Sequence, residues 1–152
     1  MSETVWKPHT TVAAMCERDG KFLLVKEKVD DKIVFNQPAG HLEPNESLLD
    51  AVVRETLEET QTEFTPTALL GIYRSIAEHA SEITYLRFLF AGKVGRCFDG
   101  QLDDGIISAH WMSYDEIVTC REQHRSPMVL QCVDDYLHKE PVSLEILIPE
   151  FR

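Results

Sequence analysis

The sequence lacks the features that would place it in a membrane or on a nucleic acid. No apolar run approaches the roughly 20 residues of a membrane-spanning helix, and the N-terminus has neither the basic nor the apolar segment of a signal peptide. Positive charge is scarce, because 15 Lys and Arg residues face 26 Asp and Glu residues, for a net charge of −11. A protein that binds a phosphate backbone needs clustered cations. We therefore expect a cytoplasmic protein with no membrane or nucleic-acid partner.

Cysteine is also sparse, and several common catalytic motifs are missing. The four cysteines form no CxxC pair, and reduced thiols in the core are expected for all of them: Cys16, Cys97, Cys120 and Cys132. The six histidines show no metal-ligand spacing such as HExxH. The absence of a P-loop and of a Gly-x-Ser-x-Gly elbow disfavours a P-loop ATPase and a serine hydrolase.

Three glutamates stand on one side of a predicted helix that follows a glycine-containing loop. The loop contains Gly40, and the helix is expected over about 47–60. Glu55, Glu58 and Glu59 are three and four residues apart, so their carboxylates project together. Like charges at these offsets repel by roughly a few tenths of a kcal/mol per pair, and the helix dipole disfavours anions in the last turns. A hard cation such as Mg²⁺ would reverse both penalties, so the pattern predicts a divalent-metal site.

The start and the packed face of this helix are also predicted. Ser47, with Asp50 three residues on, resembles a capping box, and Asn45 is the rival N-cap. The apolar residues of the helix share one broad arc beside the glutamates: Leu48, Leu49, Val52, Val53 and Leu57. We therefore expect one flank of the helix to pack on the core while its neighbour faces a cleft.

Short β-prone segments surround the helix and predict an α/β fold. Strands are expected over 10–16, 21–26, 33–37, 65–74, 83–91, 106–112 and 142–148, loops over 27–32 and 95–105, and further helices near 113–117 and over 127–136. The segment 83–91 is apolar on both faces, which is typical of a central strand. Arg87 is its exception and is expected to reach a cleft. Strands with few helices indicate a mixed sheet between helices, in one domain over 1–152.

The motif resembles the signature of the Nudix hydrolases: a glycine, five residues, a glutamate, seven residues, Arg-Glu, two residues and Glu-Glu. The matching positions are Gly40, Glu46, Arg54-Glu55 and Glu58-Glu59. Gln61 departs from the family, which usually has a glycine there as a left-handed helix cap. Flanking segments are similar to the NudJ branch of the family: 7–13, 36–43, 86–91, 111–117 and 125–127.

The resemblance implies a Nudix fold, which is an α/β/α sandwich with a mixed sheet, and Mg²⁺-dependent hydrolysis of nucleoside tri- and diphosphates, with Mn²⁺ as a substitute. It further implies release of inorganic phosphate and activity on the thiamine precursor hydroxymethylpyrimidine pyrophosphate. Two alternatives stay open, namely a Nudix pyrophosphatase for another nucleoside diphosphate derivative and a non-catalytic nucleotide sensor. The complete glutamate set favours the enzyme. Nothing in the sequence decides between a monomer and a homodimer.

The resemblance also assigns roles by position in the motif. The metal ligands would be the Gly40 carbonyl and the carboxylates of Glu55, Glu58 and Glu59, since a glycine lets the backbone approach an ion closely. Glu58 is the favoured general base, with Glu55 second. Arg54 is expected to orient a glutamate, with phosphate binding as the alternative.

Other polar and aromatic residues have two interpretations each. Arg87 contacts substrate phosphates or forms a salt bridge at the sheet edge. Phe35 and Trp6 stack on a base or lie in the core. Asp103 and Asp104 supply a further acidic ligand or base, or belong to a plain polar loop. Two more expectations complete the site: Glu46 is structural, and His41 is the one histidine inside the functional loop.

Overall fold

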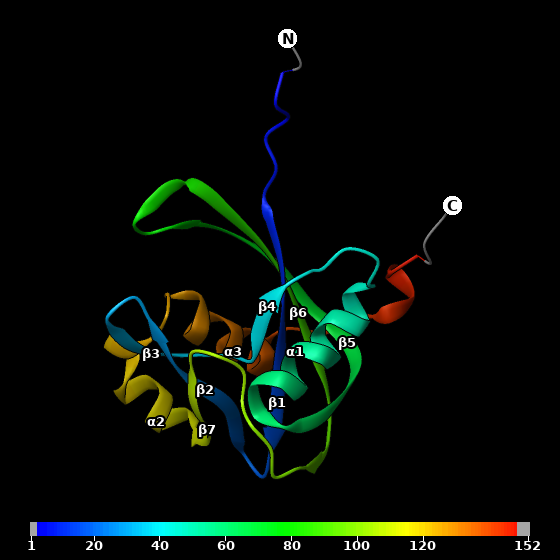
Figure 1. Cartoon of the computed structure of the whole chain (residues 1–152). Coiled ribbons are helices and arrows are strands. Elements are labelled where there is room, and N and C mark those ends of the chain that lie inside the picture. Colours follow the sequence, from blue (N-terminus) through cyan, green and yellow to red (C-terminus); the bar gives the residue numbers. More distant parts are fainter. Residues whose placement is uncertain (1–2, 149–152) are drawn as a thin grey trace.

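Two long strands form the centre of the sheet in the computed structural model, which describes residues 3–148 (Figure 1). Strand β1 (His9–Arg18) runs parallel to β6 (Ala80–Cys97), while the other strand pairs are antiparallel. The strand order is β3-β2-β1-β6-β5-β8, with β4 paired to β1 and β7 to β2. The predicted mixed sheet and the central position of 83–91 are therefore confirmed.

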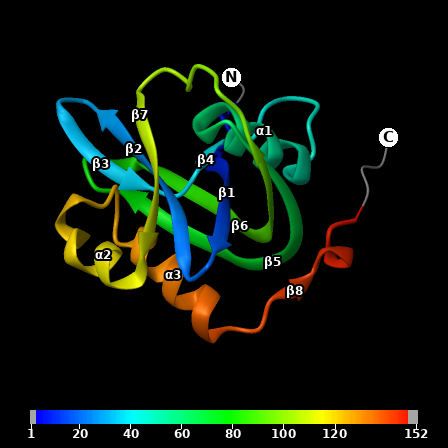
Figure 2. The same cartoon turned by 90° about the horizontal axis from the view of Figure 1, so that it is seen from below.

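The helices cover both faces of this sheet, as Figures 1 and 2 show. The other elements are β2 (Lys21–Val29), β3 (Lys32–Asn36), β4 (Ala39–His41), α1 (Leu48–Thr60), β5 (Thr62–Ala77), β7 (Ile106–Ser113), α2 (Tyr114–Thr119), η1 (Arg121–Gln123), α3 (Met128–His138), β8 (Val142–Ser143) and η2 (Leu144–Ile146). No helix within residues 3–148 is long and apolar enough to cross a membrane.

The alternating direction of the side chains along β1 explains why helices pack on both faces of the sheet. Val12, Ala14 and Cys16 point toward α1 and pack with its Ala51 and Val52. The intervening residues of β1 point the other way and join a second apolar cluster with α2 and α3, made by Ala13, Met15, Ile117, Val129, Cys132 and Val133. Since successive side chains of a strand point to opposite faces, one apolar strand supplies both cores. This is the α/β/α sandwich expected from the sequence.

The start of α1 agrees with the sequence, but its packed face does not. Ser47 is the N-cap, and its Oγ accepts a hydrogen bond from the amide of Asp50 at 3.0 Å. Val53 and Leu57, expected in the core, are 37% and 38% exposed. The buried stripe instead contains Ala51, Val52, Glu55, Thr56, Glu59 and Thr60. The helix contacts the sheet along one narrow stripe, and two of the glutamates occupy it.

The end of α1 shows how the missing glycine is accommodated. Gln61 adopts the left-handed conformation itself, with φ of 55°, and its amide donates to the carbonyl of Leu57 at 2.8 Å. This conformation costs a non-glycine residue roughly 1–2 kcal/mol. The side chain compensates, since Gln61 Nε2 donates to the carbonyls of Leu57 and Gln101 at 3.2 and 3.1 Å. Gln61 therefore connects the helix to the loop before β7.

Three further expectations for secondary structure are wrong. Residues 27–32 are not a loop, because β2 and β3 pair through Lys28 and Ile33 and turn at Asp30, whose φ is 53°. Lys28 and Lys32 of this hairpin are exposed, whereas Glu27 is half-buried and pairs with Arg125 at 3.1 Å. The tail 142–148 is not one strand, since β8 ends at Ser143, whose Oγ caps η2. Strand β6 extends to Cys97, which is exposed rather than in the core.

Candidate active site

Helix α1 presents its buried glutamates to the short strand β4. The carboxylate of Glu55 lies directly against Gly40, where a Cβ atom would overlap it. Glu59 lies one turn further along, and its Oε1 accepts a hydrogen bond from the amide of Ala39 at 2.8 Å. A side chain at position 40 would displace the Glu55 carboxylate, so glycine there preserves its position. Sequence spacing predicted these residues, and the packing explains why they meet.

Arg54 donates hydrogen bonds to a cluster of three carboxylates, those of Glu46, Glu55 and Glu58. Its Nη1 donates to Glu55 at 2.8 Å and to Glu58 at 3.1 Å. Its Nε and Nη2 donate to the two oxygens of Glu46 at 3.0 and 2.7 Å, and Nη2 also reaches the carbonyl of His41 at 3.1 Å. The contacts expected between Arg54 and the glutamates are therefore present. Its role in catalysis stays a prediction.

Glu46 fastens the loop to the helix. Besides its paired contact with Arg54, it accepts a hydrogen bond from the amide of Glu43 at 2.8 Å. The hydrogen bond from Arg54 lowers the pKa of Glu46, with the Glu43 amide as a smaller cause. A carboxylate that accepts three hydrogen bonds inside the protein is well suited to the structural role expected for it.

Burial makes two of the carboxyl groups, those of Glu55 and Glu59, costly to ionise. Desolvation raises the pKa of Glu59 to about 9, and the charges of Glu27, Glu55 and Asp103 add to the effect. Desolvation also raises the pKa of Glu55, while the hydrogen bond from Arg54 opposes it. Two buried acids and an exposed neighbour, Glu58, therefore form a region that a nearby cation would stabilise.

The donor set fits a hard divalent cation in kind. Carboxylate oxygens and a backbone carbonyl next to a glycine are the ligands that Mg²⁺ and Mn²⁺ take. Within residues 3–148, no three His, Cys, Asp or Glu side chains are grouped as a metal site. Instead, Arg54 holds Glu55 and Glu58, and the Ala39 amide holds Glu59.

The loop between β6 and β7 brings two more acids to α1. The amide of Asp103 donates to the carbonyl of Glu58 at 2.9 Å. Asp103 and Asp104 line a cavity of about 330 Å³ together with Glu58 and Gln61. The loop therefore lies beside the glutamates, as an acidic supplement to the site would require. A role for Asp104 in substrate binding remains a prediction.

Arg87 lies on the opposite face of the sheet and is almost completely buried, with 7% of its surface exposed. Its Nη1 and Nη2 donate to the side-chain oxygens of Gln37 and Asn36, both at 3.2 Å, and among the described residues Nε has no partner. The salt bridge considered for Arg87 is wrong, because no carboxylate pairs with it within residues 3–148. Sequence reasoning missed both amides, although two polar residues just before Pro38 in an apolar strand were a usable signal.

The two aromatic candidates differ in exposure. Phe35 of β3 is half-buried, with the ring of His110 edge-on at 6.1 Å and Lys26 Nζ 5.8 Å from its centre. Trp6 is 62% exposed, so its interpretation as a core residue is wrong.

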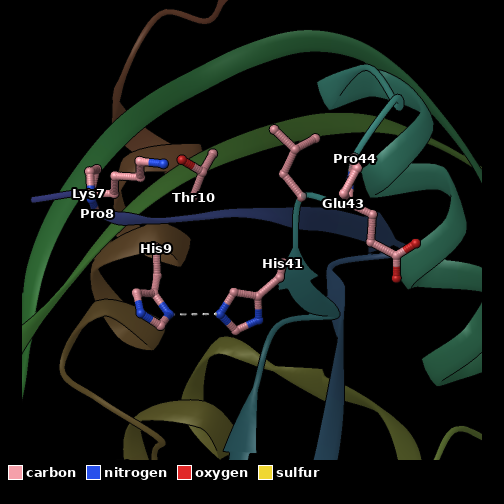
Figure 3. A pocket seen from close by; sticks show the side chains of 8 residues that line it. Lys7, Pro8, His9, Thr10, His41, Glu43 and Pro44 are labelled. Carbon is pink, nitrogen blue, oxygen red and sulfur yellow. Dashed lines mark hydrogen bonds between the residues drawn. The ribbon is translucent and has the colours of Figure 1, made fainter. Parts of the chain in front are cut away.

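A cluster of exposed rings was missed. His9 and His41 share a hydrogen bond between Nδ1 and Nε2 at 3.2 Å (Figure 3). Both rings also lie near that of Tyr85. Burial lowers the pKa of His41, and the neighbouring His9 adds to that effect. The two histidines are 32 residues apart, so no local pattern could have paired them.

Comparisons with known proteins match this geometry. The model of the NUDIX domain matches residues 6–132. The phosphatase NudJ of Escherichia coli strain K12 is 36% identical over 144 residues, which is 94% of this chain and 92% of that protein. The same figures hold for the phosphatase NudJ of Shigella flexneri. A NUDIX hydrolase from Nitrosomonas europaea superposes with a TM-score of 0.91 at 46% identity, covering 95% of this chain and 98% of the other.

Proposed function

The chain belongs to the Nudix hydrolase family and is a phosphohydrolase of phosphoanhydrides, and we propose that it is a Mg²⁺-dependent enzyme that releases phosphate from nucleoside tri- and diphosphates. The relatives named phosphatase NudJ support phosphate as the product. The proposal extends to hydroxymethylpyrimidine pyrophosphate, in line with the sequence resemblance to that branch. Nudix hydrolases generally use divalent metal ions. Mn²⁺ is expected to substitute for Mg²⁺.

The observation that carries the proposal is the carboxylate cluster between α1 and β4. Glu55 and Glu59 are buried against Gly40 and Ala39, where they are costly to ionise without a cation. The proposed ligands are these two glutamates, Glu58 and the Gly40 carbonyl. When bound, the metal would neutralise charge on the phosphate oxygens and lower the pKa of water.

Glu58 is our choice for the general base. It is the most exposed of the three, with 45% of its side chain accessible. Arg54 holds its Oε2 at 3.1 Å, and within the described residues Oε1 has no hydrogen-bond partner. Glu58 can therefore take a proton from water with one oxygen while Arg54 fixes the other. Glu55 is the second choice, since it is packed against Gly40 and already bonded to Arg54.

Three further residues are proposed to contact the substrate. Arg87 pairs with no carboxylate within residues 3–148, so its positive charge is proposed to attract a substrate oxygen. Phe35 offers a half-buried ring for contact with the substrate. Asp104 lines the cavity beside Glu58. These assignments place the phosphates at the carboxylate cluster and the rest of the substrate beyond it.

The test is phosphate release from GTP, GDP, UTP and hydroxymethylpyrimidine pyrophosphate, with Mg²⁺, with Mn²⁺ and with EDTA. We expect release of orthophosphate with either metal and none with EDTA. Glu58→Gln should reduce the rate by about 10²–10⁴-fold, the usual range for a general base. Asp50→Asn, in the exposed first turn of the same helix, is the control and should keep the wild-type rate. Metal-independent turnover, or full activity in Glu58→Gln, would reject the assigned site.

A further inference from the structure

Three rings from three different strands meet on the face of β4 that is turned away from α1. His9 opens β1, His41 closes β4 and Tyr85 lies on β6. Register explains the meeting, because Thr11 pairs with His41 and His9 pairs with Tyr85. The ring centroid of His9 lies 5.4 Å from that of His41 and 5.6 Å from that of Tyr85, and both pairs of rings are edge-to-face. We call these three residues the ring cluster; Figure 3 shows its two histidines.

The ring cluster lies next to the proposed phosphate site. His41 directly follows Gly40, and consecutive Cα atoms are about 3.8 Å apart. Because side chains alternate along a strand, Gly40 faces Glu55 on α1 while His41 projects to the other side. A nucleotide whose phosphates lie at Gly40 could therefore place its base on the opposite face of β4. His9 and His41 also line a cavity of about 510 Å³.

The chemistry of the ring cluster suits a flat, hydrogen-bonding ligand. Both histidines are exposed and Tyr85 is half-buried, so the rings are accessible. When two neutral imidazoles share one hydrogen bond, the donor ring keeps a bare nitrogen and the acceptor ring keeps an N–H. The pair then offers one acceptor and one donor in either tautomeric state. Such a pair can meet bases that differ in their edge groups.

A purely structural role explains less of this arrangement. Strands β1 and β4 are already held by three residue pairs, from Thr11–His41 to Ala13–Ala39. A hydrogen bond between two exposed side chains adds little to such a ladder, because water competes for both partners. Three accessible rings beside a phosphate site are better explained by a ligand that stacks on them.

We propose that His9, His41 and Tyr85 form the subsite for the heteroaromatic base of the substrate. The proposal rests on the proposed function in that the phosphates of the same ligand occupy the Gly40 side of β4. It assigns the ring cluster to base binding and the α1 carboxylates to hydrolysis. Removing a ring should therefore weaken the binding of nucleotides and leave the binding of inorganic polyphosphate unchanged.

The experiment compares two probes by titration calorimetry in the presence of Mg²⁺. One probe is guanosine 5′-(β,γ-imido)triphosphate, which has a base and a non-hydrolysable terminal linkage, and the other is inorganic tripolyphosphate. His9→Ala should raise the Kd of the nucleotide probe about ten-fold or more, as expected for loss of one base–aromatic contact. The Kd of tripolyphosphate should change less than about two-fold. His9→Phe keeps the ring and should recover most of the affinity for the nucleotide.

His138→Ala removes an exposed histidine at the end of α3 and is the matched control. It should leave both Kd values unchanged. Equal weakening of both probes by His9→Ala would show a structural role and overturn the proposal, as would wild-type affinity for the nucleotide probe. Wild-type protein that binds neither probe would also overturn it. Nucleotide binding that depends on His9, without any phosphate release, would keep the subsite and reject the proposed function.

Discussion

The two arginines on opposite faces of the sheet have opposite electrostatic surroundings. Arg54 on the α1 side hydrogen-bonds three carboxylates, of Glu46, Glu55 and Glu58, and lies 3.7 Å from a fourth, of Glu43. Within the described part of the chain, Arg87 on the α3 side has two amide oxygens as hydrogen-bond partners, and its Nε has none.

The difference teaches where each kind of ligand charge would be stabilised. On the α1 side, negative charge exceeds the single guanidinium, so a further cation is favourable. On the α3 side, a buried positive charge has no carboxylate, so an anionic or polar substrate group is favourable. The two clusters together would bind a metal and a phosphorylated ligand from either side of β4.

In the comparison of the two arginines, the largest effect is expected when the guanidinium of Arg54 is removed. Arg54→Gln should lower kcat/KM about 100-fold, because Glu58 and Glu55 lose the donor that orients them, and residues that orient metal ligands typically contribute 10–100-fold. Steady-state phosphate release measures the effect. Arg96→Gln is the control, since Arg96 pairs with Glu63 at the exposed surface. Equal rates in both variants would mean that Arg54 does not position the glutamates.

On the α3 side, the buried carboxylate of Asp135 is bound by groups other than Arg87. Its contribution can be tested through the stability of the protein. Asp135 accepts hydrogen bonds from Tyr73, Gln131 and Lys139. Asp135→Asn should lower the free energy of unfolding by about 2 kcal/mol at pH 7, as expected for hydrogen bonds to a charged group. Glu122→Gln, at a fully solvated carboxylate, should change it by less than about 0.5 kcal/mol.

The same variant has a defined pH dependence. Burial alone would raise the pKa of Asp135, but its hydrogen bonds outweigh burial and lower the pKa below the ordinary 3.8. A depressed folded-state pKa stabilises the protein above the unfolded-state value, and this contribution is lost as the pH falls through the folded-state value. Urea unfolding should therefore show a constant difference between wild type and Asp135→Asn above pH 3.8 and a shrinking one below it. A difference that grows in acid would contradict the assignment.

Removing the positive charge of Arg87 should affect substrate binding more than folding. Arg87→Met should raise KM for nucleotides about ten-fold, because a substrate oxygen loses its donor. The free energy of unfolding should change by less than about 1 kcal/mol, since removing a buried charge without a carboxylate offsets two lost hydrogen bonds. Arg74→Met, on the exposed face of β5, is the control. An unchanged KM with a large loss of stability would make Arg87 a structural residue.

The smallest expected effect concerns the end of α1. Gln61→Gly relieves the left-handed strain but adds chain entropy in the unfolded state and removes the hydrogen bond to Gln101. These terms nearly cancel, so the free energy of unfolding should change by less than about 1 kcal/mol. Activity should fall a few-fold, because the loop with Asp103 and Asp104 loses its tie to the helix. Wild-type activity in this variant would mean that the loop does not contribute to the active site.

The parts that could be predicted from the sequence depend on local spacing. The helix over 47–60, its Ser47 cap and the shared side of Glu55, Glu58 and Glu59 follow from helical periodicity and capping chemistry. Strand alternation and apolar content similarly placed 83–91 at the centre of the sheet.

The parts that could not be predicted depend on distant pairing. Which stripe of α1 is buried depends on its contacts with β5, β1 and β4, so Val53 and Leu57 were misplaced. Arg87 is buried because Asn36 and Gln37, about 50 residues earlier, accept its hydrogen bonds. His9 and His41 meet only through strand register. Local patterns carry no information on such contacts.

The measurement that tests the account most directly is a calorimetric titration of Mg²⁺, with Mn²⁺ in parallel. Wild-type protein and Asp50→Asn should bind the metal with the same affinity, and the double variant Glu55→Gln/Glu59→Gln should bind it at least ten-fold more weakly. Circular dichroism should show that the double variant remains folded, since its substitutions remove buried carboxyl groups that are costly to ionise. Metal binding that is unchanged in the folded double variant, or absent from the wild type, would contradict the assignment of the α1 carboxylates as the metal site.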